Sequence, residues 1–92
     1  MEHRITKETV VCRKIEGDVR VDSGVRFHLV GMVNGDLYVE PGAECQVDGI
    51  VLGDVENAGH TVIRGTVVGS LVDVDDGYTD VHPNASIPGE YP

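Results

Sequence analysis

Three aspartates are the residues whose spacing most suggests a shared chemical role. Asp18, Asp36 and Asp54 each follow a glycine, and their positions differ by 18 each time. Equal intervals in a repeat fold would stack these carboxylates about 5 Å apart, a distance at which like charges repel. Two interpretations follow. Each carboxylate accepts backbone N–H bonds at a bend, or the column faces a basic partner or a cation.

The overall charge supports a basic partner in general terms. The chain carries 16 acidic against 7 basic residues, a formal charge of −9. This charge disfavours nucleic acid and anionic membranes as partners, and it favours high solubility or a basic protein partner. The acids predicted to form a partner-binding face are Asp18, Asp36, Glu40, Asp48, Asp54 and Glu56.

Catalytic and metal-binding constellations are not indicated. The repeat suggests no His partner for Cys12 or Cys45, so no activated nucleophile is expected. The histidines do not share metal-ligand spacing; they are His3, His28, His60 and His82. The acidic segment after Asp73 partly matches a calcium loop, but Gly77 comes one place early and no glutamate occupies position 12. We therefore expect no enzyme, no metal site and no cofactor.

The elements that position the aspartates are predicted by the glycines. Gly17, Gly35 and Gly53 recur at the same interval of 18 and Gly69 follows after 16, which indicates recurring tight corners. Between the corners apolar residues alternate, as in Val25-Phe27-Leu29 and again one interval later in Ala43-Cys45-Val47. Alternation is typical of strands with one buried face. One such interval then makes three strands and three bends, which is one turn of a parallel β-helix.

The predicted fold is an all-β, single-stranded parallel β-helix of about 3–4 turns. It covers residues 14–73, where the repeat is visible. Residues 1–13 are predicted to be a lead-in strand or cap. Residues 74–92 are acidic and hold three of the four prolines, so we expect an extended or disordered tail.

Two segments carry a resemblance to a known family. Gln46–Val55 reads QVDGIVLGDV and Thr61–Gly69 reads TVIRGTVVG. Both resemble the core of the bactofilins, polymer-forming bacterial cytoskeletal proteins, and the resemblance covers residues 14–73. It implies a right-handed β-helix and a structural role.

Two functions remain open at this point. In the first, a bactofilin-like protein stacks end to end or dimerises. The contact residues would then be Val10, Val11, Ile15 and Val19 at one end and Val67, Leu71 and Val72 at the other. In the second, an acidic inhibitor of immunity or antitoxin type blocks a basic toxin or nuclease. The residue-by-residue repeat favours the first, in which the partner is a second copy of the chain.

The sequence also predicts a location. No apolar run approaches the roughly 20 residues of a membrane helix, and the polar start Met1–Arg4 has no signal-peptide core behind it. We expect no transmembrane segment and a cytoplasmic protein.

Overall fold

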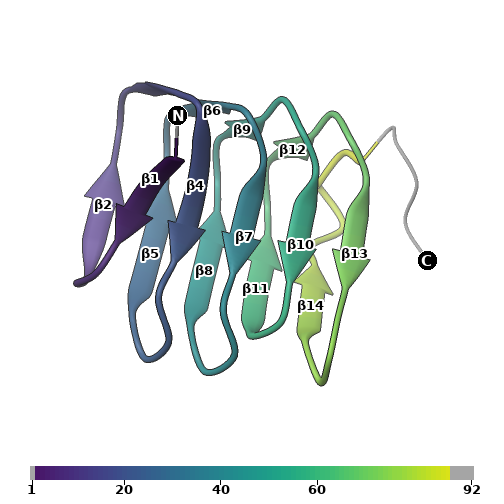
Figure 1. Ribbon diagram of the computed structural model, residues 1–92. Helices are drawn as coiled ribbons and strands as arrows, with labels where there is room; N and C mark the ends of the chain where they lie inside the picture. Colours follow the sequence, from purple (N-terminus) through teal and green to yellow (C-terminus); the bar gives the residue numbers. More distant parts are fainter. Residues whose placement is uncertain (1, 88–92) are drawn as a thin grey trace.

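The computed structural model describes residues 2–87, which form a solenoid of short parallel strands without any helix (Figure 1). The strands make three sheets that run the length of the stack. Sheet A holds β1 (Glu2–Ile5), β4 (Asp18–Val21), β7 (Leu37–Val39), β10 (Val55–Asn57) and β13 (Leu71–Asp73). Sheet B holds β2 (Thr9–Val11), β5 (Arg26–Leu29), β8 (Glu44–Val47), β11 (His60–Ile63) and β14 (Tyr78–Val81). Sheet C holds β3 (Lys14–Glu16), β6 (Met32–Asn34), β9 (Ile50–Val51) and β12 (Thr66–Val67).

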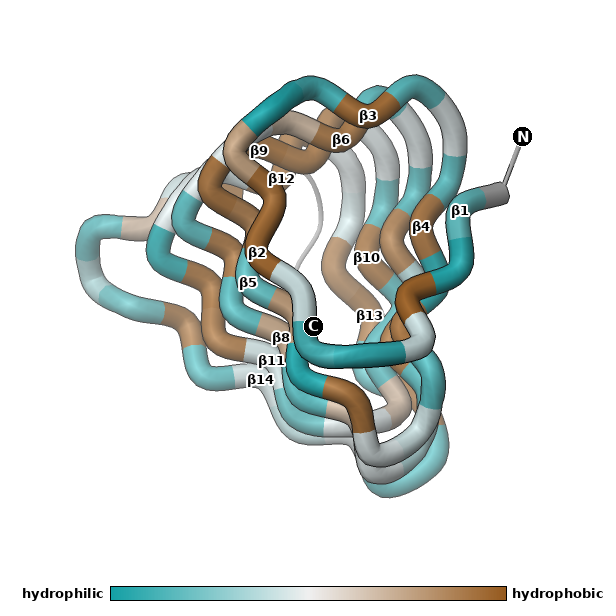
Figure 2. The backbone as a smooth tube through the Cα atoms, turned by 90° about the vertical axis from the view of Figure 1, so that its left-hand side faces the viewer, coloured by the Kyte–Doolittle hydropathy of each residue, from teal (hydrophilic) through white to brown (hydrophobic). Residues whose placement is uncertain are grey.

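Each turn of the solenoid contributes one strand to each sheet in the order A, B, C. Turns 1 to 4 are β1–β3, β4–β6, β7–β9 and β10–β12. A partial turn 5 follows, made of β13, β14 and a parallel bridge from Ser86 to Thr66. The chain descends along sheet A, ascends along sheet B and crosses along sheet C to the next turn. The solenoid is therefore right-handed (Figure 1 and Figure 2).

The register places equivalent residues of successive turns directly over one another. Val19 pairs with Leu37, Leu37 with Val55, and Val55 with Leu71. Most steps advance the chain by 18, but Thr61 follows its partner Cys45 by only 16. The shortening falls at the corner between sheets A and B in turn 4, and turn 1 is shortened at the same corner, since Val21 follows its partner Ile5 by 16. The predicted all-β parallel solenoid and its repeat length are confirmed.

The core consists of the inward-facing residues of all three sheets. Aliphatic columns dominate, and Figure 2 shows similar hydropathy recurring at equivalent places from turn to turn. Phe27 is the largest side chain with no exposed surface. β-Branched and aromatic residues suit such pleated, tightly packed surfaces. Toward turn 5 the interior becomes polar, because Asn57, Thr61 and Thr79 are also buried.

The solenoid extends beyond both predicted boundaries. β1 and β2 pair with β4 and β5, so residues 2–11 belong to turn 1 instead of forming a separate cap. β14 pairs with β11, so residues 78–81 are ordered strand in place of the predicted tail. These segments lack the Gly-Asp corner but keep the inward alternation, and alternation is enough to continue the stack. Residues 88–92 of the predicted tail lie outside the described residues.

Glycine at the corner between sheets C and A is required by the stacking. A Cβ at Gly53 would stand 2.5 Å from the carbonyl oxygen of Gly35 and nearer still to Asp36 Oδ1. Both distances are far shorter than van der Waals contact. Gly24, at the corner between sheets A and B, has a φ of +76° and no atom within 4 Å of the place a Cβ would take. Glycine is therefore favoured at position 24 only by the left-handed backbone conformation.

We expect Gly53→Ala to destabilise the protein by about 2 to 3 kcal/mol, because the stacked turns must move apart. Gly24→Ala is the matched control and should cost only about 1 kcal/mol, the cost of a left-handed conformation. Urea unfolding followed by circular dichroism measures both. Equal losses in the two variants would contradict the role assigned to Gly53.

Candidate functional site

The three spaced aspartates form a hydrogen-bonded ladder along the corner between sheets C and A. The backbone N–H of Asp36 donates to Asp18 Oδ1 at 2.8 Å, and the N–H of Asp54 donates to Asp36 Oδ1 at 2.8 Å. The N–H of Ser70 continues the series to Asp54 Oδ1, also at 2.8 Å. Each carboxylate therefore joins its own turn to the next one, as the first interpretation of these residues predicts.

Tyr38 lies beside this ladder on the outer face of sheet A. Its hydroxyl donates to Asp36 Oδ2 at 3.3 Å, and the Arg20 guanidinium stacks over its ring at 5.0 Å. Burial, followed by the nearby charges of Asp36 and Asp18, raises the pKa of Tyr38 above its usual value. The phenol therefore stays protonated and available as a hydrogen-bond donor to the ladder.

The predicted acidic partner-binding face is not a single surface. Glu40 lies at the corner between sheets A and B, where it forms a 2.6 Å ion pair with Arg20. Asp48 lies at the corner between sheets B and C, and Glu56 is exposed on sheet A. The structure brings together Asp18, Asp36 and Asp54, and Glu56 lies opposite Tyr38 on the same outer face of sheet A, but Glu40 and Asp48 lie at the two other corners. The physical reason is that intervals other than a whole turn place residues at different corners.

Sequence reasoning missed a polar cluster on the outer side of sheet B. His28 Nε2 lies 2.5 Å from Asp48 Oδ2, and the Gln46 amide donates to the same oxygen at 3.0 Å. Burial opposes ionisation of Asp48, but the hydrogen bonds from His28 and Gln46 outweigh it and lower its pKa. The sequence does carry a signal for the pair His28 and Asp48. The two residues are separated by 20 positions, which is one turn of 18 plus two residues along a strand, and the same separation relates Arg20 to Glu40.

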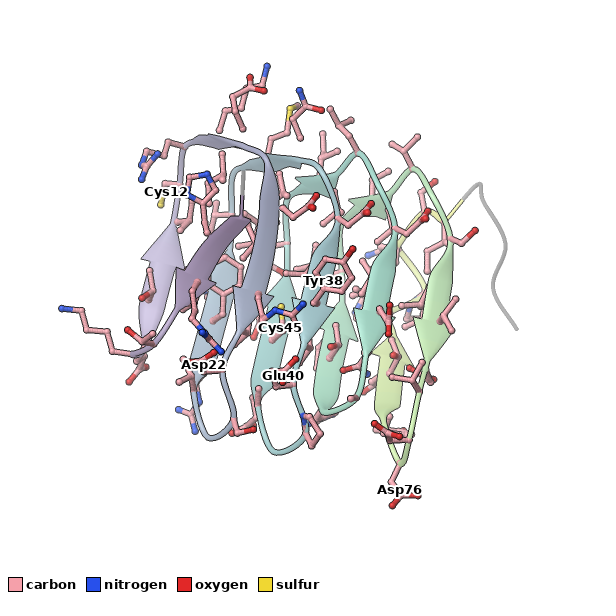
Figure 3. The ribbon with its side chains drawn as sticks, in the orientation of Figure 1. Cys12, Asp22, Tyr38, Glu40, Cys45 and Asp76 are labelled. Carbon is pink, nitrogen blue, oxygen red and sulfur yellow. The ribbon has the colours of Figure 1, made fainter. Side chains whose placement is uncertain are left out.

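The cysteines differ in environment. Cys45 is buried in the core, and burial raises the pKa of its thiol to about 12, so it has no thiolate character near neutral pH. Cys12 is exposed at the end of the solenoid that holds turn 1 (Figure 3). Both thiols are free. The inward orientation predicted for Cys45 is confirmed.

The predicted assembly residues do not all lie at the ends of the stack. Val10 and Val72 are exposed, at 59% and 41%. Val11 and Ile15 point inward in turn 1 and are buried. Val19, Val67 and Leu71 have no exposed surface, and the first two lie inside the stack, because turn 1 covers Val19 and the bridge at Ser86 extends past β12.

The exposed strand edges are the open features of the two ends. Alternate residues of a parallel strand direct their main-chain groups to opposite neighbours. The N–H of Val30 donates to the Val11 carbonyl, so Thr9 and Val11 face turn 2 and Val10 faces outward. In β14 the N–H groups of Tyr78 and His82 donate to turn 4, so Thr79 and Val81 face outward. Within residues 2–87 the outer edges of β2 and β14 have no strand partner.

Comparisons with known proteins leave the chain without an assigned family. No family model matches it, and no curated protein or solved structure shows significant similarity to it. Across residues 2–87 there is no helix capable of crossing a membrane. The same residues contain no group of three or more His, Cys, Asp or Glu side chains arranged to hold a metal ion.

Replacing Asp36 tests the ladder. Asp36→Ala leaves the N–H of Asp54 without its acceptor, and we expect a loss of about 1 to 3 kcal/mol in unfolding free energy. Asp36→Asn retains an acceptor oxygen and is expected to cost less. Chemical denaturation at neutral pH compares the two. A loss in Asp36→Asn as large as that in Asp36→Ala would show that charge, and not the hydrogen bond, is the stabilising feature.

The lowered pKa of Asp48 predicts an acid-dependent stability. Because the folded state stabilises the carboxylate, its contribution is complete above the ordinary aspartate pKa and declines as pH falls through the lowered value. Asp48→Asn should therefore reduce stability at pH 7 and flatten the decline at acidic pH. Thermal melts between pH 7 and pH 2 follow the difference between the parent and the variant. A constant difference across that range would contradict the assignment.

Proposed function

We propose that this chain is a structural protein that assembles with copies of itself by stacking its solenoids end to end. The observation that carries the proposal is the pattern of unpaired main-chain groups along the two open strand edges. Thr79 and Val81 of β14 present main-chain groups away from turn 4, and Val10 of β2 presents its own away from turn 2. When a second copy is placed on turn 5, the main-chain groups of the two edges alternate in the same way as those that join successive turns within the chain.

The side-chain columns support the same arrangement. Continuing the sheet B register across a junction places Thr9 of the second copy over Thr79 and Val11 over Val81, since both pairs occupy equivalent columns. On sheet C the bridge at Ser86 puts Ile87 in the column of Val67, which leads back to Ile15. Like side chains therefore meet in three columns. Unpaired strand edges and apolar columns at the ends of a repeat stack favour such association.

The two inward columns of sheet A fit less well. One begins at His3 and ends at Leu71, so a stacked copy would place its histidine over a leucine. The other runs from Ile5 through Val21 and Val39 to Asn57 and Asp73. A stacked copy would place its Ile5 over Asp73, whose Oδ1 already accepts from Thr79 at 2.5 Å. A carboxylate against an aliphatic side chain weakens the contact. The junction between copies is therefore weaker than the junctions between turns, which makes assembly reversible.

The resemblance to the bactofilins supports the same role, since those proteins form polymers. The proposal includes a cytoplasmic, non-enzymatic protein whose partner is itself. An acidic inhibitor of a basic protein is the second hypothesis. It has less support because several of its predicted acids are engaged within the chain, as with Glu40 on Arg20 and Asp48 on His28.

Proline at Val10 tests end-to-end stacking. Val10 is exposed and its N–H points away from turn 2, so Val10→Pro removes an edge donor at little cost to the fold. We expect the concentration needed for assembly to rise at least about tenfold, the equivalent of one lost hydrogen bond. Val10→Thr keeps the N–H and is the control.

Sedimentation velocity over a range of concentrations, with negative-stain microscopy, provides the measurement. Circular dichroism verifies that both variants keep the parent's strand content. A parent chain that stays monomeric at every concentration would refute end-to-end stacking. Undiminished assembly of Val10→Pro would show that any association uses another surface.

A further inference from the structure

The outer face of sheet C carries no charged side chain in turns 2 to 4. Its outward residues form two columns along the solenoid axis, which begin in turn 1 with Lys14 and Glu16. Beyond turn 1 both columns are uncharged. Their members are Met32, Ile50 and Thr66 in the first column and Asn34, Leu52 and Val68 in the second. Together the two columns make up the sheet C face.

The outer faces of the two other sheets differ in this respect. On sheet A, Arg20 and Glu56 point outward. On sheet B, Arg26 and Glu44 do so. Within residues 2–87, sheet C is therefore the one side of the solenoid that stays uncharged over turns 2 to 4.

The sheet C face is also apolar and open to solvent. Leu52 and Val68 are exposed at 38% and 46%, and Val30, which directly precedes β6, is exposed at 45%. Met32 and Ile50 are half-buried, and with Val30 they line a shallow hollow of about 440 Å³. Figure 1 shows β6, β9 and β12 side by side with no other described segment over them. Apolar patches of this kind mark interaction sites.

Three stacked glycines keep this hollow open. Gly31, Gly49 and Gly65 line it along the corner between sheets B and C. A Cβ at Gly65 would stand 2.0 Å from the carbonyl oxygen of Gly49, so the close approach of the turns excludes side chains from this corner. The result is a furrow beside Met32 and Ile50 that can receive aliphatic side chains of a partner.

The charge of the chain favours a second copy as that partner. Two chains of −9 repel each other, and the repulsion is weakest where neither presents a charge. A basic protein would be attracted to the acids on the other sides, and an anionic membrane would repel the chain as a whole. The centre of a homodimer interface is apolar and depleted of charge. The sheet C face has both properties.

The charged ends of the two columns specify how two copies face each other. Lys14 and Glu16 form an exposed ion pair at 2.9 Å. A two-fold axis parallel to the solenoid axis would set each turn opposite the same turn of the second copy, and each column opposite the other column. The two ion pairs would then join in a ring of four alternating charges, and Ile50 would face Leu52 of the second copy. A two-fold axis along the strands would instead set Glu16 over Val68, a carboxylate against an aliphatic side chain.

We propose that two copies pair side by side through their sheet C faces, related by a two-fold axis parallel to the solenoid axis. The contact is isologous, so it closes at two copies. The face spans four strands, about 14 Å at about 4.8 Å per step, which makes a small interface and a weak pair. The pairing uses a side of the solenoid and not its ends, so it is independent of the proposed stacking.

Sedimentation equilibrium of the Val10→Pro chain measures the side-by-side contact, because that change weakens stacking. We expect an equilibrium between monomer and dimer. Adding Val68→Glu places a carboxylate from each copy in the interface and should raise the dissociation constant at least about tenfold. Val72→Glu is the matched control, since Val72 is exposed at 41% on the outer side of sheet A. It should leave the dimer unchanged.

Charge exchange at the first turn tests the orientation. In the Val10→Pro background, Glu16→Lys should raise the dissociation constant about fivefold at low ionic strength, because like charges then meet within and between copies. Adding Lys14→Glu should restore the original value, since opposite charges again face each other at every position. A dissociation constant that neither change alters would overturn the two-fold axis parallel to the solenoid.

The outcomes separate pairing from stacking. A Val10→Pro chain that stays monomeric at every concentration refutes the pairing, whatever the parent does by stacking. A dimer that persists in Val68→Glu overturns the use of sheet C. A chain that dimerises only after removal of residues 88–92 would overturn the second copy as the native occupant, in favour of that segment. Circular dichroism verifies that each variant retains its strand content.

Discussion

The close approach of successive turns at the Gly-Asp corner is the constraint on which the structure depends. A carboxylate of one turn accepts the backbone N–H of the next, and it passes over a glycine that has no side chain to obstruct it. Asp36 shows both halves of this device, since it donates its N–H to Asp18 and accepts from Asp54. The negative charges can stack because each is stabilised by a donor in place of a counter-ion. This one interaction therefore sets the spacing between turns and makes glycine necessary at the corner.

The same device explains how much could be predicted from the sequence. Gly35-Asp36 and Gly53-Asp54 are visible as a repeat because their roles are local to a corner, so the fold class followed from spacing alone. The ends could not be delimited, because β1 and β14 join the stack through inward alternation without that corner. The pair His28–Asp48 escaped notice because its separation in the sequence becomes meaningful only when the turn length and the pleat are combined.

The interior changes character along the axis. Asn57 replaces the aliphatic residues of its column, and its amide donates to Thr79 Oγ1 and to the Tyr78 carbonyl, both at 2.9 Å. Thr61 occupies the column of Phe27 and Cys45, and within the described residues its buried hydroxyl has no partner. Polar groups in a core contribute less than aliphatic packing unless they are fully bonded. Turns 4 and 5 are therefore expected to be the less stable part of the solenoid and the first to open.

This gradient in the interior bears on the proposed assembly. A solenoid with identical turns could associate at either end in either direction, and nothing in its shape would limit growth. Here the apolar interior of turn 1 differs from the polar interior of turn 5, so the two ends of the stack are not equivalent. In the proposed stacking, Asp73 would face Ile5 of the next copy and would lower the affinity of the junction. The proposed assembly therefore combines a repeat that favours stacking with an end residue that keeps the stacking reversible.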